Sequence, residues 1–139
     1  ASITPKFSTS NILINVNLYV GCDQTNSSGY QQSYFIYKNG SELDEVNGDE
    51  EGGRQGVAGA INMYDPGGAN QTMYQIARLG GTHMDYAVGA TSAQTYSVRT
   101  RSYTSGPTIY INRSQTFQVQ GTNYDHVPQS TITLTEIAA

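Results

Sequence analysis

The stretch that most constrains the fold is residues 11–20, NILINVNLYV. Apolar residues occupy every second position, so in an extended chain they project from one face and the intervening residues project from the other. A helix would scatter them around its circumference, whereas β-branched side chains pack well on a pleated sheet. Burying the five inward side chains contributes about 10 kcal/mol, at roughly 2 kcal/mol each, and this requires a second layer that covers the strand. The inward set is Ile12, Ile14, Val16, Leu18 and Val20.

A hairpin is predicted further along the chain. Residues 34–37 run into Asn39-Gly40, a dipeptide that accepts positive φ at both central positions of a two-residue turn. Residues 42–46 are then predicted to return as the second strand. Residues 21–32 and 80–92 are different in composition. They are rich in turn formers or glycine and are predicted to be loops.

About nine or ten short alternating segments follow one another at nearly regular spacing, and no stretch predicts a convincing helix. The pattern predicts an all-β fold, an antiparallel β-sandwich of the jelly-roll type. An immunoglobulin-like sandwich is the alternative. The absence of tryptophan and of a cysteine pair disfavours it.

Composition bounds the size of the fold and its partners. With 139 residues, the chain is expected to form one jelly-roll domain over residues 1–139. Only 13% of the residues are charged, the net charge is −4 and no basic cluster is present, so nucleic acid is not an expected partner. No stretch is as long and apolar as a membrane span, and we expect no membrane partner. Cys22 is the single cysteine, which excludes an intramolecular disulfide.

Tyrosine is the unusual component, with eleven residues against three phenylalanines. Tyr19, Tyr37 and Tyr110 fall opposite the apolar positions of their own segments and are predicted to point out of the sandwich. Scattered surface tyrosines need no special explanation. The sharper interpretation is a subunit interface to which Asn112 also contributes, because tyrosine combines an apolar ring with a polar tip. Symmetric self-association is the default for such a surface.

Three segments carry a resemblance to a known class of proteins. They are residues 108–114, TIYINRS, the polar loop that follows them, and residues 130–139, STITLTEIAA. Together they resemble small jelly-roll virion surface proteins and fibre domains of tailed bacteriophages, notably phages of marine bacteria. The resemblance implies a tumour-necrosis-factor-like jelly roll, usually a homotrimer, that is made in the cytoplasm of a bacterial host and sits on the virion surface. It also implies contacts with other virion proteins, as a capsid decoration, a short head fibre or a fibre tip.

Few residues suggest a catalytic or metal-binding site. Glu45, Asn47, Asp49 and Glu51 alternate and could offer oxygen ligands to Ca²⁺, but their spacing is not that of an EF-hand, so a solvated loop is favoured. The pairs His83 with Asp85 and Asp125 with His126 lie in predicted loops. No serine occupies a GxSxG turn. We therefore predict no catalytic residue, no cofactor and no metal site, and a protein that is not an enzyme.

Three arginines leave two interpretations open. Arg99, Arg101 and Arg113 form either a small cationic patch for an anionic glycan or cross-strand pairs with Glu136, and the pairing is favoured.

The alternative function is a carbohydrate- or receptor-binding module of a tail fibre that recognises a host surface glycan. In that hypothesis two loops, residues 22–32 and 47–56, form the site. Their candidate ligand residues are Asp23, Asn26, Asp49, Glu50 and Glu51.

Overall fold

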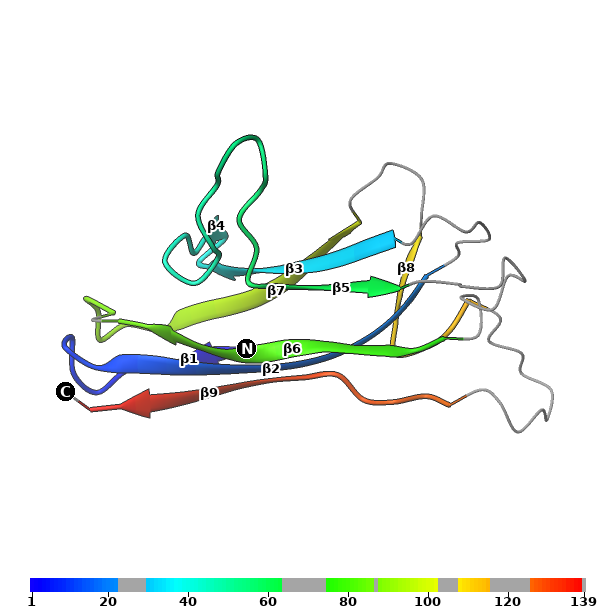
Figure 1. Cartoon of the computed structure of the whole chain (residues 1–139). Helices are drawn as coiled ribbons and strands as arrows, with labels where there is room; N and C mark the ends of the chain where they lie inside the picture. The colour runs from blue at the N-terminus through cyan, green and yellow to red at the C-terminus, as the bar shows by residue number, and fades with distance from the viewer. Residues whose placement is uncertain (23–29, 64–74, 87, 103–107, 116–125, 139) are drawn as a thin grey trace.

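The protein is an all-β sandwich. The computed structural model describes residues 1–22, 30–63, 75–86, 88–102, 108–115 and 126–138 (Figure 1). Within these ranges there is no helix, and so none that is long and apolar enough to cross a membrane. The described strands are β1 Ser2–Ile3, β2 Asn11–Cys22, β3 Tyr30–Lys38, β4 Ser41–Glu42, β5 Gly59–Met63, β6 Ala77–Asp85, β7 Gln94–Ser102, β8 Ile109–Ile111 and β9 Thr131–Ile137.

The strands form two antiparallel sheets that lie face to face (Figure 1). In the first, called here the β3 sheet, the order is β1-β7-β3, and both β4 and β5 pair with β3. In the second, called the β2 sheet, β6 pairs with one edge of β2, while β9 and β8 pair with successive parts of its other edge. The predicted antiparallel β-sandwich is therefore confirmed.

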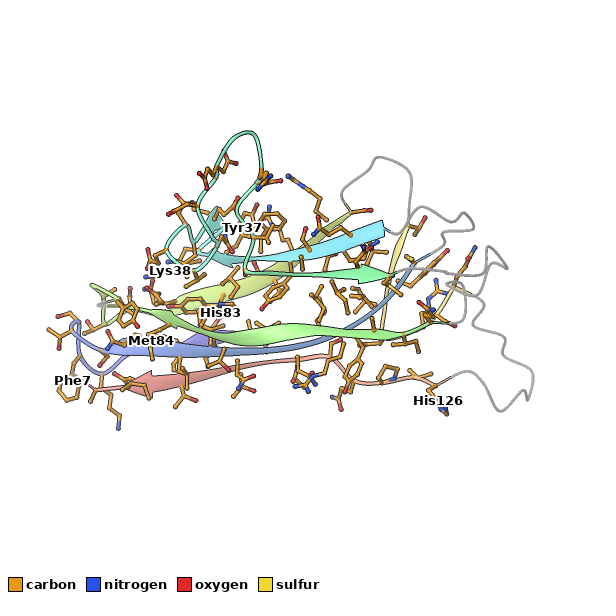
Figure 2. All side chains as sticks on the ribbon, in the orientation of Figure 1. Phe7, Tyr37, Lys38, His83, Met84 and His126 are labelled. Carbon is orange, nitrogen blue, oxygen red and sulfur yellow. The ribbon has the colours of Figure 1, made fainter. Side chains whose placement is uncertain are left out.

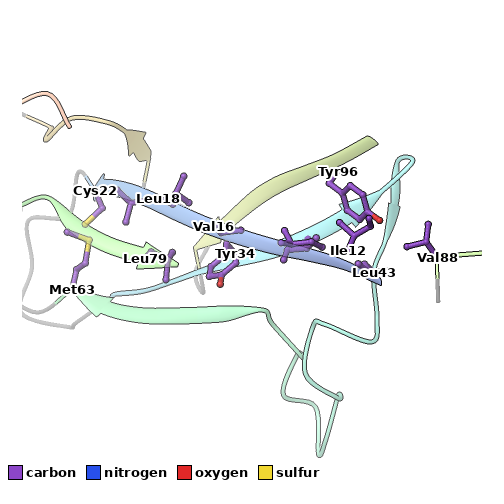
Figure 3. Close-up of a cluster of buried hydrophobic side chains, with 13 residues drawn as sticks. Ile12, Val16, Leu18, Cys22, Tyr34, Leu43, Met63, Leu79, Val88 and Tyr96 are labelled. Atoms are coloured by element: carbon purple, nitrogen blue, oxygen red, sulfur yellow. The ribbon is translucent and has the colours of Figure 1, made fainter. Parts of the chain in front are cut away.

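The predicted burial pattern of residues 11–20 is also confirmed. All five inward side chains of β2 are buried, and they meet Tyr34 and Ile36 of β3 and Tyr96 of β7 (Figure 3). The alternation runs from residue 11 to residue 20, where the intervening residues are half-buried or exposed, and it ends at the buried Gly21 and Cys22. Each sheet thus supplies the second layer that the other requires.

The loop predicted for residues 80–92 is wrong over its first part. β6 continues through Gly80 and Gly81 to Asp85, and it pairs with β2 along its full length. A Cβ atom added at Gly80 would lie 2.2 Å from the backbone oxygen of Val16. Glycine is therefore needed here because two strands approach closely, and it does not mark the end of a strand.

Two other predicted segments differ in their bounds. The Asn39-Gly40 turn is confirmed, with φ values of 51° and 89°. The returning strand, however, is only β4, because the backbone turns at once: the N–H of Val46 donates to the carbonyl of Leu43. In the predicted loop 21–32, the first two residues belong to β2 and residues 30–32 belong to β3, while residues 23–29 lie outside the described part.

Candidate functional site

The outer face of the β3 sheet carries a groove of about 490 Å³. The segment between β4 and β5 rises above the sheet and forms one of its walls (Figure 1). Five of its eight lining residues have polar side chains that can donate hydrogen bonds, and Val57 and Ala60 contribute apolar surface. The polar set is Gln31, Ser33, Arg54, Gln55 and Arg101.

Arg101 is held in place within this groove. Its guanidinium lies over the Phe35 ring, 5.3 Å from the centroid, and its Nη1 donates to Oε1 of Gln55. The Ser33 hydroxyl donates to the Arg101 carbonyl at 3.2 Å. Among the described residues, neither Arg101 nor Arg54 has a carboxylate within 4.0 Å. Two guanidinium groups therefore face one groove with capacity left for an anion.

The predicted pairing of the arginines with Glu136 is wrong. The Glu136 carboxylate faces the segment before β2, where it accepts hydrogen bonds from the Ser10 hydroxyl at 2.7 Å and from the Lys6 N–H at 2.6 Å. These hydrogen bonds, that of Ser10 foremost, lower the pKa of Glu136 below its ordinary value. Its Oε1 atom is thus engaged by the segment before β2, and none of the three arginines lies within 4.0 Å of the carboxylate among the described residues.

Arginines instead cover two of the three predicted interface tyrosines. The Arg99 guanidinium lies 3.9 Å from the centroid of the Tyr37 ring, and that of Arg113 lies 4.2 Å from the Tyr110 ring. Both tyrosines are half-buried, and so is Tyr19. Each covering guanidinium makes a cation–π contact with the ring beneath it.

The structure brings only part of the predicted interface set together. Tyr19 and Tyr110 lie near each other, because Tyr110 pairs with Gly21, two residues beyond Tyr19 on β2. Asn112 joins them through its N–H, which donates to the Tyr19 carbonyl, while its side-chain oxygen accepts the N–H of Ser130 at 2.9 Å. Tyr37 lies in the other sheet (Figure 2).

The middle of the outer face of the β2 sheet is a ladder of uncharged polar residues. The register places Thr133 of β9 beside Asn15, and Thr82 of β6 on the other side of Asn15. Thr131 pairs with Asn17 in the same way. These side chains are short, and a charged group lies beside them, since the Arg78 Nε donates to Oδ1 of Asn17 at 2.6 Å.

One end of the same face is apolar. Leu13 of β2 pairs with Met84 of β6, and Tyr86 joins both around a shallow hollow of about 410 Å³. Ile137 lies two residues further along β9 than Thr135, the partner of Leu13. Tyr86 is 68% exposed and Ile137 is 40% exposed, which is unusual for large apolar side chains. Leu13, Met84, Tyr86 and Ile137 are called the apolar patch.

The acidic loop does not gather ligands as the alternating pattern suggested. The Asn47 side chain is buried and is used by the fold: its Oδ1 accepts the Ile36 N–H at 3.1 Å. Asp49, Glu50 and Glu51 are exposed, and Asp49 and Glu50 line an acidic hollow of about 270 Å³. Across the described ranges, no three His, Cys, Asp or Glu side chains are grouped as around a metal ion.

The two histidines lie apart from each other (Figure 2), and the structure does not describe the remaining candidate residues. Asp23, Asn26 and Asp125 lie outside the described residues. His126 is exposed, at the end of the sandwich opposite to Met84 (Figure 2). The interior histidine, His83, shares a hydrogen bond of 2.7 Å with the Tyr34 hydroxyl. Burial lowers the pKa of His83 and raises the pKa of Tyr34, so both groups stay neutral near pH 7.

A buried polar cluster was missed in the sequence. Asp85 accepts a hydrogen bond from the Tyr96 hydroxyl at 2.5 Å and forms an ion pair with Lys38 at 2.8 Å. The three residues come from β6, β7 and β3, so only the topology brings them together. A correct assignment of β6 would have placed His83 and Asp85 on its inner face, because they are two positions apart.

Comparison with known proteins adds no relative to this description. The chain matches no protein-family model, no curated protein and no solved structure.

Proposed function

We propose that this chain is a non-catalytic structural protein of a tailed-phage virion. In this proposal it is a jelly-roll homotrimer that serves as a capsid decoration or as a short head fibre or fibre tip. It is made in the bacterial cytoplasm and displayed on the virion surface, where it contacts other virion proteins. The resemblance of residues 108–114 and 130–139 supports the virion assignment.

The apolar patch is the observation that supports self-association. Large apolar side chains that are exposed together on a flat face mark protein interaction sites. The neighbouring Asn and Thr side chains are uncharged, and the Arg78 guanidinium beside them already has a hydrogen-bond acceptor in Asn17. Tyr19 and Tyr110 extend the same face at its other end. A second copy of this chain is the partner that such a face fits best, because closed symmetry lets one surface be used by every subunit.

Light scattering on a sizing column tests this proposal. We expect the wild-type protein to have three times the mass of the 15.0 kDa chain. Met84→Glu combined with Ile137→Glu is expected to yield folded monomers, since two carboxylates would be desolvated in the interface. Ser97→Glu, on the exposed outer face of the β3 sheet, is the matched control and should remain trimeric. A wild-type monomer at micromolar concentration would contradict the proposal.

The groove on the β3 sheet favours a second candidate function, a carbohydrate- or receptor-binding module. A groove of this volume lies within the range of about 300–1,000 Å³ that small ligands occupy. Arg54 and Arg101 suit a carboxylate or sulfate group of a host surface glycan, and the amides of Gln31 and Gln55 suit its hydroxyls.

An array of neutral, carboxylated and sulfated glycans tests this second function. We expect binding only to acidic glycans, with a loss of about tenfold or more in Arg101→Gln, because a charge-assisted hydrogen bond contributes about 1.5–3 kcal/mol. Arg78→Gln removes the same charge from the other sheet and should leave binding unchanged. Equal affinity of the two variants would show that net charge, and not the groove, determines binding.

A further inference from the structure

Lys38 and Asp85 are the last residues of strands in opposite sheets, and their side chains meet in the interior. The Lys38 Nζ atom lies 2.8 Å from Oδ2 of Asp85. The Asp85 side chain is 1% exposed and that of Lys38 is 20% exposed. An amine nitrogen is thus held against a carboxyl group at a place from which bulk water is largely excluded.

Tyr96 polarises the same carboxyl group. Its hydroxyl donates to Oδ2 at 2.5 Å, so this oxygen faces two donors, Tyr96 and Lys38. Burial raises the pKa of Tyr96, with a further contribution from Asp85, so the phenol keeps its proton and remains a donor. Donors aimed at one oxygen draw electron density from the carbonyl carbon, which makes that carbon a better target for a nucleophile.

Glu45 supplies a second carboxyl group to the cluster. It lies on the turn after β4, close enough to Asp85 for the two carboxyl groups to influence each other. Desolvation raises the pKa of Glu45, the neighbouring Asp85 raises it further, and Lys38 lowers it. A carboxyl group beside both reacting residues can accept a proton from one and pass it to the other. Because residue 45 is also exposed, the turn connects this proton to solvent.

We propose that the side chains of Lys38 and Asp85 condense spontaneously into an amide that links the two sheets covalently, with Glu45 as the proton carrier. This proposal does not depend on the proposed virion function, since it concerns chemistry within a single folded chain.

The condensation balances without any other reactant. The Lys38 ammonium first gives one proton to the Asp85 carboxylate, which leaves a neutral amine and a carboxylic acid. The nitrogen lone pair then attacks Cγ of Asp85, and the C–N bond forms. A second nitrogen proton passes through Glu45 to the departing hydroxyl, the C–O bond breaks, and one water molecule leaves. The products are a neutral amide, one water molecule and a Glu45 in its initial protonation state.

Burial favours the amide over the ion pair from which it forms. Two buried charges lose their hydration free energy, and their mutual attraction does not always compensate for this loss. Formation of a neutral amide removes both charges. Because the fold holds the two groups in contact, the reaction is intramolecular. Each group therefore experiences a very high effective concentration of the other. The buried apolar residues Ile12, Leu43 and Val88 belong to the surrounding core and keep the site dry.

Intact mass spectrometry of the folded, purified chain tests the proposal. We expect the wild-type mass to be lower than the sequence mass by one water molecule. Acylated Lys38 resists trypsin, so the digest should contain residues 7–54 joined to residues 79–99. A full sequence mass after prolonged incubation, or separate recovery of a peptide that ends at residue 38 and of peptide 79–99, would overturn the proposal.

Three variants separate the roles of the residues. Lys38→Arg keeps the positive charge but has no amine for this reaction, and it should retain the full sequence mass. Glu45→Gln changes an exposed residue, should fold, and should also retain the full mass because an amide does not carry the proton. Glu42→Gln alters a nearby exposed carboxylate and should lose water as the wild type does. If Glu45→Gln still lost water, Glu45 would not be the proton carrier.

Discussion

The two ends of the interior are built differently (Figure 3). One end is apolar. Its members are Leu18, Val20, Cys22, Met63 and Leu79. At the other end, Tyr96 packs beside Ile12, Leu43 and Val88, but its hydroxyl is directed to the Asp85 carboxylate, which Lys38 also contacts.

The difference shows which quantity determines stability at each end. In the apolar end, a substitution costs free energy in proportion to the buried volume that it removes. In the polar end, the cost depends on which charged or polar partners are left without a counterpart. Three variants test this contrast.

Asp85→Ala is expected to have the largest effect. It leaves Lys38 and the Tyr96 hydroxyl without their partner and removes the proposed cross-link, and loss of the buried ion pair alone costs about 3–5 kcal/mol. Urea denaturation measures the loss in the free energy of unfolding. Asp44→Ala, at an exposed position, is the control and should change it little. Equal stabilities of the two variants would show that the polar end contributes no more than surface charges do.

Leu79→Ala is expected to have a smaller effect, of about 2–4 kcal/mol, through lost burial and the cavity that remains. Leu79→Met conserves volume and should cost less than about 1.5 kcal/mol in the same denaturation experiment. If the two variants were equally unstable, shape and not volume would control this end.

The smallest expected effect is the pH dependence that His83 introduces. Its pKa is lowered from 6.5 by burial, so its contribution to stability is full above pH 6.5 and is lost as the pH falls through the lowered value. His83→Gln keeps an acceptor for the Tyr34 hydroxyl but does not titrate. Its thermal midpoint should therefore fall by a few degrees less than that of the wild type between roughly pH 7 and pH 5. Parallel pH profiles would refute this role.

The sandwich could be predicted because its central strand obeys a local rule. Alternation along residues 11–20 needs no knowledge of distant residues, and the Asn39-Gly40 turn is equally local. The same local reasoning gave a wrong prediction for the first part of residues 80–92. Gly80 is required by the approach of the Val16 carbonyl on β2, a constraint that is invisible in the residues around it.

The candidate sites were harder to predict for a related reason. Arg101 and Glu136 were placed by charge alone, but Glu136 is engaged by Ser10 and Arg101 is held by Gln55. Tyr37 was grouped with other outward tyrosines, although strand order puts it on the other sheet. The strand pattern in the sequence determines the direction in which a side chain points. Which side chains contact each other depends on the order of the strands in the sheets, and the periodicity does not determine that order.

The groove and the apolar patch lie on the outer faces of opposite sheets. Copies that associated through the apolar patch would therefore leave every groove open to the surroundings. Several weak sites held at fixed spacing on one particle would bind a repetitive surface with an avidity that exceeds the affinity of any single groove, by as much as about 10²–10⁴-fold. Each groove would then need only modest affinity for its ligand. Release of the particle would require that all bound grooves dissociate at the same time.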